Sequence, residues 1–389
     1  MKLFEDRGQA AQGPRTHALI IGVGAYPHLL GGDGAVRSPV TMGLGQLTSP
    51  VVSATEFAEW VKSSMDNPAA PLDTIELLLS PTKEAAKSRA FPDAPRATMA
   101  EIQRAFTDWQ DRCDTHPGNI GLFYFSGHGV EPDKFILLPE DFGAKSNPWV
   151  NAIDMNETYL AMAGCAARTQ CYFIDACREA PEETAKARGV TPVSLLFKEN
   201  LIPSARTAPF VKAAPEAARA FGLPGEVSYF TSALLDCLKG LGVSQNDGDY
   251  WKVDTDSLIT ALKRRMLRRR LPNGKPMSCD PRGDIGQPVD IHQFQGRARI
   301  LASIACNPMA ATAQASFCAR DSHGCEEKRT APKNERWEIE VLTGPWDVDA
   351  SFQPACDWNG GSVKGRNAHP PYFEVNVPVT PARASRGRP

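Results

Sequence analysis

Short apolar runs recur along the first half of the chain and end at glycine, serine, proline or an acidic residue. Runs of this length without polar alternation are typical of strands buried on both faces of a parallel sheet. The runs are 17–23, 74–80, 120–126, 133–141 and 171–174. We therefore expect these segments to form the strands of one buried sheet.

Amphipathic segments separate several of these runs. Apolar residues recur at helical spacing in 49–65, 98–113 and 156–167. The second segment opens with Thr98 three residues before Glu101, which is the spacing of a capping box. Strands that alternate with helices favour an α/β fold with right-handed crossovers, in which ligands bind beyond the carboxyl ends of the strands.

The pattern changes in the second half of the chain. Glu179–Gly225 is rich in Ala, Pro, Lys and Arg, lacks strand patterning and predicts a linker. A strand leading into a helix is expected at 226–240 and a helix at 251–270. Polar, Pro and Gly residues at Asn273–Gln287 mark a boundary, and the short alternating runs of 290–389 predict a small β-rich domain.

Composition restricts the function classes. Of 389 residues, 42% are apolar and 23% are charged, and the net charge is −2, which indicates a globular protein rather than a disordered chain or a basic nucleic-acid coat. Ten cysteines are far too few for a disulfide scaffold of this length. No leading or later stretch is apolar enough for a signal peptide or a membrane span, so we expect a cytoplasmic protein without a membrane partner.

Two of the predicted strands end in residues of complementary chemistry. FYFSGHG (123–129) contains His128, and YFIDACR (172–178) contains Cys177, 49 residues later. An imidazole that accepts the proton of a nearby thiol makes the sulfur an effective nucleophile, and glycines beside the histidine leave room for a substrate. Each residue alone has a structural explanation, as a hydrogen-bonded histidine or an inert buried thiol, but together they predict acyl transfer.

At these residues the chain resembles a caspase-like cysteine peptidase of clan CD, in the metacaspase and bacterial caspase group. The matching pieces begin with HALIIGVGAY and continue through the His128 and Cys177 blocks to SYFTSAL, over about Thr16–Arg270. The resemblance implies a caspase-like, mainly parallel sheet flanked by helices. It also implies that Cys177 is the nucleophile, that His128 handles its proton, and that the amides of Gly129 and Cys177 form an oxyanion hole.

The resemblance also divides the chain. It implies a large-subunit region (17–180) and a small-subunit region (226–272), separated by a linker with possible processing sites (181–225). The sequence pattern itself predicts that this linker is mobile and adds an N-terminal tail (1–16) and a β-rich accessory domain (290–389). The linker contains six basic residues: Lys186, Arg188, Lys198, Arg206, Lys212 and Arg219. We expect processing at Arg188, Arg206 or Arg219, by the protein itself or by an upstream protease; the alternative is a solvated insertion.

Substrate preference follows from Asp175. Residues two apart on a strand share a face, so its carboxylate is expected beside Cys177, where it would bind a cation. Aspartate-cleaving caspases carry Gln at this position, whereas relatives that cleave after Arg or Lys commonly carry an acid, which implies a basic P1 residue. Asp33 is the candidate for a second acid, and the alternative for Asp175 is a carboxylate that holds backbone amides.

The resemblance further suggests a substrate-pairing strand at Ser228–Ser232, with Ser228, Tyr229 and Ser232 in contact with the substrate by β-augmentation. Tyr229 has a plainer alternative as a core aromatic residue. Arg178 stands where many metacaspases have His, so calcium activation is not carried over, and no cofactor is expected. Protein substrates are expected partners, and bacterial relatives suggest a zymogen in a stress or antiphage pathway.

Two other functions compete with a peptidase. One is a catalytically silent scaffold of the same fold, and the other is nucleic-acid binding through the basic helix Lys263–Arg270. Four cysteines in the C-terminal region, with His323 nearby, are the candidate ligands of a zinc site. Their spacings of 12, 7 and 31 residues match no short ligand pair, so no metal is expected. These cysteines are Cys306, Cys318, Cys325 and Cys356.

Overall fold

A computed structural model of the chain describes most of its length. The described residues are 4–8, 13–131, 133–176, 191–197, 205–214, 224–244, 250–269, 274 and 276–382. The chain divides into two compact units. The first comprises Met1–Leu235 with Leu262–Gln293, and the second comprises Asp236–Ala261 with Phe294–Pro389.

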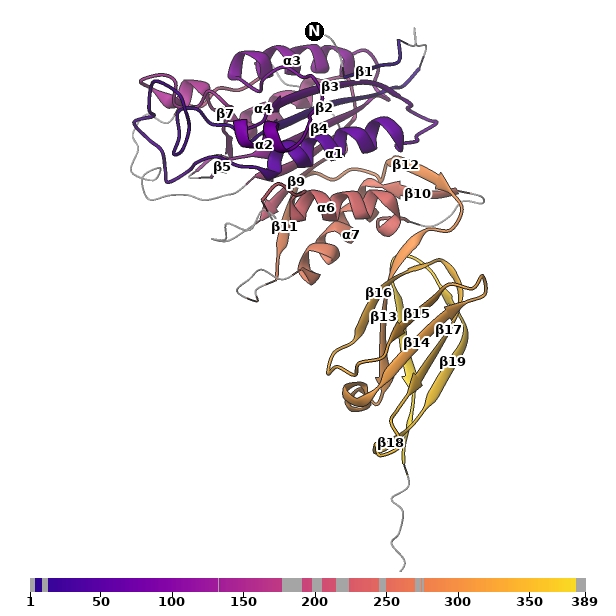
Figure 1. Cartoon of the computed structure of the whole chain (residues 1–389). Coiled ribbons are helices and arrows are strands. Elements are labelled where there is room, and N and C mark those ends of the chain that lie inside the picture. The colour runs from indigo at the N-terminus through magenta and orange to yellow at the C-terminus, as the bar shows by residue number, and fades with distance from the viewer. Residues whose placement is uncertain are drawn as a thin grey trace, which may run out of the picture. The chain divides into compact units, whose positions relative to one another are not determined.

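The first unit is built on a seven-stranded sheet of order β1-β3-β2-β4-β8-β9-β11 (Figure 1). The five inner strands are parallel, and β1 and β11 are antiparallel strands at the two edges. The strands are β1 (Glu5–Asp6), β2 (Thr16–Val23), β3 (Leu72–Ser80), β4 (Ile120–Gly127), β8 (Thr169–Ala176), β9 (Ala208–Ala214) and β11 (Ser278–Asp284). The strands predicted at 17–23, 74–80, 120–126 and 171–174 are confirmed.

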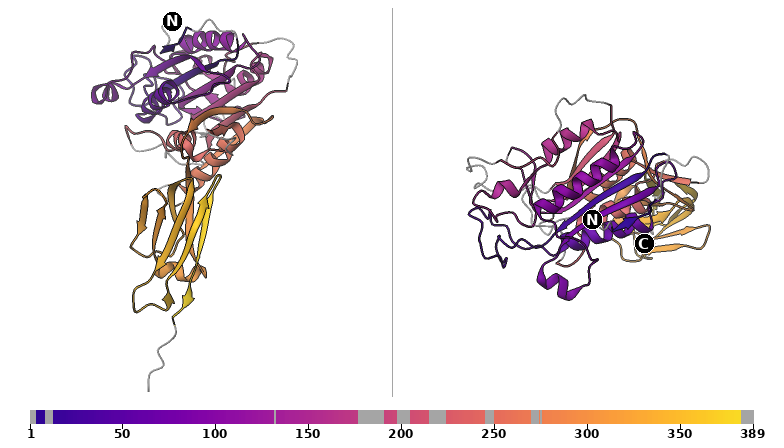
Figure 2. Two further views of the ribbon diagram at one scale, coloured as in Figure 1. Left: turned by 90° about the vertical axis from the view of Figure 1, so that its right-hand side faces the viewer. Right: turned by 90° about the horizontal axis from the view of Figure 1, so that it is seen from above.

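Helices cover both faces of this sheet (Figures 1 and 2). Phe57 of α1 stacks on Tyr124 of β4, whereas Trp109 of α3 packs on Phe123, the neighbouring residue of opposite face. The helices are α1 (Ser49–Ser63), α2 (Lys83–Ser88), α3 (Met99–Cys113), α4 (Met155–Ala161), α6 (Tyr229–Asp236) and α7 (Thr255–Arg268). No helix in the described ranges has both the length and the apolar character needed to cross a membrane.

Local signals explain the helix ends. Thr98 caps α3, since its side chain accepts the amide of Glu101, as the capping-box spacing predicts. The helix predicted at 156–167 is shorter than expected: α4 ends at Ala161, and a 3₁₀ turn, Met162–Gly164, follows. Three further short helical turns, η1, η3 and η4, lie at Pro148–Asn151, Cys237–Leu241 and Met309–Gln314.

The apolar run 133–141 does not join the main sheet. It contributes only β6 (Ile136–Leu137), which lies between β5 (Gly129–Val130) and β7 (Ile153–Asp154) in a separate three-stranded sheet. The prediction of a further strand of the central sheet is therefore wrong for this run. Its aromatic and aliphatic residues are instead buried against the α3 and α4 side of the core.

Three strands of the main sheet lie where none was predicted. β1 falls in the expected N-terminal tail, β9 (APFVKAA) in the expected linker and β11 (SCDPRGD) in the expected boundary segment. β9 pairs with β8 on one side and with β11 on the other, so partners distant in sequence stabilise it. Pro281 in β11 is compatible with an edge strand, because an edge strand leaves some amides unpaired.

The strand predicted at the start of 226–240 is also wrong. Residues from Tyr229 form α6, and Ser228 caps this helix by accepting the amide of Thr231 at 3.0 Å. A serine at this position satisfies an amide that the first helical turn leaves free, which favours helix over strand.

The second unit contains the β-rich part predicted for the C-terminal region (Figures 1 and 2). One of its sheets has the order β16-β13-β20 and another has the order β15-β14-β17-β19. Phe317 of β14 stacks against Trp337 of β16, and Trp346 is buried with its Nε1 donating to Leu342 O at 2.8 Å. Its strands are β10 (Tyr250–Asp254), β13 (Arg299–Asn307), β14 (Ser316–Asp321), β15 (Glu326–Arg329), β16 (Trp337–Leu342), β17 (Gly344–Ser351), β18 (Trp358–Asn359), β19 (Gly361–Ala368), β20 (Phe373–Pro378) and β21 (Thr380–Pro381). A further strand, β12 (Asp290–Gln295), lies mostly in the first unit, which ends at Gln293.

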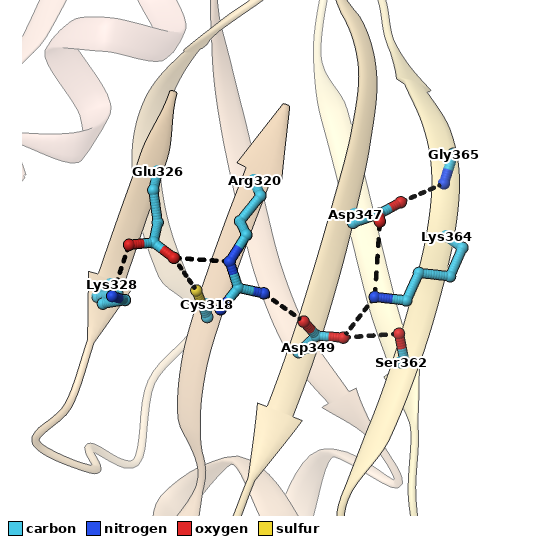
Figure 3. Close-up of polar contacts among 9 residues, drawn as sticks. All are labelled: Cys318, Arg320, Glu326, Lys328, Asp347, Asp349, Ser362, Lys364 and Gly365. Atoms are coloured by element: carbon cyan, nitrogen blue, oxygen red, sulfur yellow. Dashed lines mark hydrogen bonds and ion pairs between the residues drawn. The ribbon is translucent and has the colours of Figure 1, made fainter. Parts of the chain in front are cut away.

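Opposite charges alternate across one face of the four-stranded sheet (Figure 3). Arg320 of β14 donates to Glu326 of β15 at 2.6 Å and to Asp349 of β17 at 2.9 Å. Lys364 of β19 donates to the other oxygen of Asp349 at 3.0 Å. Because opposite charges pair across the strands, this face is an ion-pair network rather than a patch of one sign.

Candidate active site

The pairing of β4 with β8 brings the two predicted site segments to one edge of the sheet. The parallel register joins Ser126 to Asp175 and Gly127 to Ala176. His128 is the next residue after Gly127, and Cys177 is the next residue after Ala176 in the sequence. Cys177 itself lies outside the described residues.

His128 is buried and is bonded through one ring nitrogen. Its Nε2 lies 2.7 Å from the carbonyl oxygen of Gly45. A carbonyl only accepts, so Nε2 carries the proton and Nδ1 carries the lone pair. Burial lowers the pKa of His128 to about 4, so the imidazole is neutral at neutral pH. A neutral imidazole with an unprotonated Nδ1 is the form that accepts a proton from a thiol.

Asp175 lies beneath a group of hydroxyls. Its Oδ2 accepts from Thr231 Oγ1 at 2.8 Å, from Ser126 Oγ at 3.3 Å and, through a short bond, from Ser228 Oγ. Burial raises the pKa of Asp175, and the hydroxyl donors lower it in part. In the described part of the chain, no Lys, Arg or His forms an ion pair with this carboxylate.

Ser126 and Thr231 were not predicted from the sequence. The sequence contained an indication for both. Ser126 lies on β4 two residues before His128, and Thr231 follows Ser228 by three residues, which is about one helical turn. Tyr124 extends the group, since its hydroxyl lies 2.6 Å from Thr231 Oγ1. Predicting these contacts required knowing that 229–236 is a helix whose first turn faces β4 and β8.

The other predicted substrate residues are placed differently. Tyr229 and Ser232 lie on α6, so the predicted substrate-pairing strand is not present at these positions. The guanidinium of Arg269 donates to Ser232 Oγ at 2.8 Å and lies over the Tyr229 ring. Asp33 lies on an exposed loop and pairs with Lys83 at 2.6 Å, which lowers its pKa. Asp33 therefore pairs with a surface lysine rather than with the Asp175 group.

Gly129, the predicted oxyanion donor, is a buried residue of β5 immediately after His128. This strand pairs with β6 through Gly129 and Leu137. The small sheet therefore holds the backbone on the carboxyl side of the histidine.

One of the three predicted processing sites is buried. The Arg206 side chain donates from Nε to Asp284 at 2.6 Å and from Nη1 to Gln170 at 3.2 Å. A peptidase needs an extended, accessible segment, so the prediction of processing at Arg206 is wrong for the folded protein. Arg188 and Arg219 lie outside the described residues.

The described residues contain no metal cluster, and burial leaves the Cys171 thiol unreactive. No group of three or more His, Cys, Asp or Glu side chains in these residues is arranged to hold a metal ion. Burial raises the pKa of the Cys171 thiol, on the same strand as Asp175, to about 12. Such a thiol stays protonated and is a poor nucleophile.

Comparison with known proteins defines the class. The caspase domain family, Peptidase C14, matches residues 15–280, and the chain belongs to this family of caspase-like cysteine peptidases. The chain is 28% identical over 257 residues to an uncharacterized protein of Sinorhizobium fredii, a match that covers 61% of this chain and 70% of that protein. It is also 28% identical over 243 residues to a probable protease of a Desulfuromonadales bacterium, covering 58% of this chain but only 28% of the relative.

Two solved structures also align with the chain. Caspase-1 from Spodoptera frugiperda aligns with 74% of this chain and 96% of its own, with a TM-score of 0.41 and 11% identity. The structure of pro-sf-caspase-1 aligns over the same shares with a TM-score of 0.40 and 10% identity.

Proposed function

We propose that this chain is a cysteine endopeptidase in which Cys177 is the nucleophile and His128 is its proton acceptor and donor. The observation that carries the proposal is the neutral His128 at the end of β4, with Nε2 bonded to Gly45 and Nδ1 carrying the lone pair. Cys177 follows the strand residue that pairs with Gly127. Membership of the caspase domain family supports the same assignment.

The proposed reaction is acyl transfer in two steps. Nδ1 of His128 takes the thiol proton, and the sulfur of Cys177 bonds to the carbonyl carbon of the substrate. The amides of Gly129 and Cys177 donate to the developing oxyanion. The peptide C–N bond then breaks, and His128 gives its proton to the leaving amine. Water, deprotonated by His128, hydrolyses the thioester and restores the thiol.

The proposed substrates are proteins cleaved after Arg or Lys. Asp175 supports this preference, because it is a buried carboxylate that hydroxyls stabilise and that no described cation neutralises. Burying a carboxylate is costly without a cation, and a guanidinium or ammonium group of a substrate would supply one. The three hydroxyl bonds to Oδ2 would hold the carboxylate in place for such a cation.

Activation by cleavage is part of the proposal. Arg188 and Arg219 remain as sites in the linker, cut by the protein itself or by an upstream protease, since Arg206 is buried. A zymogen of this kind would suit a bacterial stress or antiphage pathway, as the resemblance suggests. The physical consequence to look for is fragments that end at Arg188 or Arg219 and none that end at Arg206.

The test uses the full chain and fluorogenic peptides with Arg, Lys or Asp at P1. We expect hydrolysis of the Arg and Lys peptides by the wild type and none by Cys177→Ala, with Cys171→Ala as the matched control that stays active. Asp175→Asn should lower kcat/KM for the basic peptides by about 100-fold, since a charge-assisted bond contributes roughly 3 kcal/mol.

The competing functions predict other results. If wild type and Cys177→Ala behave alike on every peptide, before and after a cut in the linker, the chain is a silent scaffold. Binding of RNA that weakens steeply with salt, without turnover, would support nucleic-acid binding through Lys263–Arg270. The observation that Arg269 of this run is held by Ser232 and Tyr229 does not favour that function.

A further inference from the structure

Three hydrogen bonds link Tyr26, His128 and Leu138. The His128 amide donates to Tyr26 Oη at 2.7 Å, and the same hydroxyl donates its own proton to Leu138 O at 3.2 Å. The Leu138 amide in turn donates to His128 O at 3.0 Å. The three residues therefore form a closed ring of hydrogen bonds that fixes the His128 backbone on both sides.

The Tyr26 ring also limits the imidazole. Its centroid lies 4.7 Å from that of the His128 ring at an interplanar angle of 46°. Gly127 makes this approach possible, because a Cβ at that position would lie 2.8 Å from Tyr26 Oη and 3.0 Å from the Phe125 ring. Burial raises the pKa of Tyr26 far above its usual range, so the hydroxyl keeps its proton.

Gln46 fixes Tyr26 in turn. Its Oε1 accepts the Tyr26 amide at 2.8 Å, and its Nε2 donates to Tyr26 O at 2.8 Å and to Leu30 O at 3.0 Å. Gln46 directly follows Gly45, whose carbonyl accepts from His128 Nε2. The Gln46 carboxamide thus fixes Tyr26, which holds the His128 backbone, relative to Gly45. The Gly45 carbonyl in turn determines which nitrogen of the His128 ring carries the proton.

We propose that Tyr26 and Gln46 are positioning residues that hold His128 as the Nε2–H tautomer, with Nδ1 presented to the nucleophile. The role in catalysis rests on the proposed peptidase function, whereas the effect on the tautomer does not. Groups that orient a ring nitrogen through its surroundings commonly affect function by 10- to 100-fold, and a small displacement of a proton acceptor has effects of similar size.

The chain offers a matched control in Tyr159. Its hydroxyl also accepts a backbone amide, that of Asp284 at 2.7 Å, and donates to a backbone carbonyl, that of Ala208 at 2.9 Å. Tyr159→Phe therefore removes two bonds of the same kind as those that Tyr26→Phe removes, but these bonds do not involve the backbone of His128. A loss of stability common to both variants is thereby separated from an effect on the histidine.

The experiment combines two measurements on the full chain. Two-bond proton–nitrogen NMR spectra of protein labelled with ¹⁵N-histidine report the tautomer, and His128→Gln identifies the His128 signal. We expect Nε2–H alone in the wild type and in Tyr159→Phe, and a mixture of tautomers in Tyr26→Phe and Gln46→Ala. On basic peptides, kcat should fall by roughly 10- to 100-fold in the last two variants with little change in KM.

Gln46→Ala keeps the test valid if Tyr26→Phe does not fold, because Gln46 is only half-buried. A single unchanged tautomer in a folded Tyr26→Phe or Gln46→Ala protein would overturn the inference, whatever the activity. If the tautomers mix but the wild type hydrolyses no peptide, the assignment of positioning residues holds and the proposed peptidase function fails. If kcat falls equally in Tyr159→Phe, the catalytic part of the inference is wrong.

Discussion

At the scale of single residues, burial decides the protonation of the candidate site. His128 is neutral because its surroundings exclude water, and the Gly45 carbonyl determines which nitrogen holds the proton. The sequence predicted His128 and Asp175 from their positions at strand ends. It could not predict Gly45, Tyr26 or Gln46, because their contacts with His128 depend on how a loop 80 or more residues away folds over the strand end.

A second buried histidine provides a stability test at the same scale. The pKa of His17 is also lowered to about 4, by burial and then by Arg112 and Arg15. The unfolded chain binds this proton near pH 6.5, so the stabilising contribution is present above pH 6.5 and is lost as the pH falls through about 4. This contribution to the free energy of unfolding is on the order of 3 kcal/mol for such a histidine.

We therefore expect His17→Gln to reduce the loss of stability between pH 6.5 and 4. Urea unfolding at several pH values measures this, with substitution of the exposed His369, His369→Gln, as the control. Equal pH dependence in wild type and His17→Gln would show that His17 is not held neutral in the folded protein.

At the scale of elements, the fold was predictable where the pattern is local. The strands 17–23, 74–80 and 120–126 and the cap of α3 follow from short stretches of sequence. β9 and β11 do not, because small residues, a lysine and a proline become strands only through partners distant in the chain. The start of α6 was wrongly predicted to be a strand. Ser228 caps this helix, and the sequence alone does not reveal that role for a single serine.

Ser228 has two roles that a single substitution removes. Ser228→Ala loses the cap of α6 and the short bond to Asp175, so we expect the free energy of unfolding to fall by about 2–3 kcal/mol. Ser232→Ala, four residues along the same helix, loses one half-buried bond to Arg269 and should lower it by only about 1 kcal/mol. Chemical denaturation measures both, and equal effects would contradict the role of Ser228 in capping.

Arg206 joins three elements at the opposite end of the strands from His128. It bonds to Gln170 of β8, to the Tyr159 carbonyl of α4 and to Asp284 of β11. We expect trypsin to leave the bond after Arg206 intact in the native protein. In the same protein unfolded in urea, we expect trypsin to cut this bond. Peptide mass mapping measures this, and rapid native cleavage after Arg206 would restore it as a processing site.

At the scale of the whole molecule, the candidate site lies within one of the two compact units. Every described residue of the candidate site belongs to the first unit, which contains most of the caspase domain match. The β-rich part of the second unit was predictable because its strands alternate polar and apolar residues. Charges on one face of its four-stranded sheet pair with one another, as Arg320, Asp349 and Lys364 do.

The central claim is that His128 activates Cys177 toward substrates with a basic P1 residue. The most direct measurement is peptide mass mapping after reaction of the full chain with an Arg-based acyloxymethyl ketone probe, which alkylates an activated thiol. The account predicts one adduct, on Cys177, that disappears in His128→Gln and does not form with an Asp-based probe. An adduct spread over other cysteines, or equal labelling of wild type and His128→Gln, would contradict it.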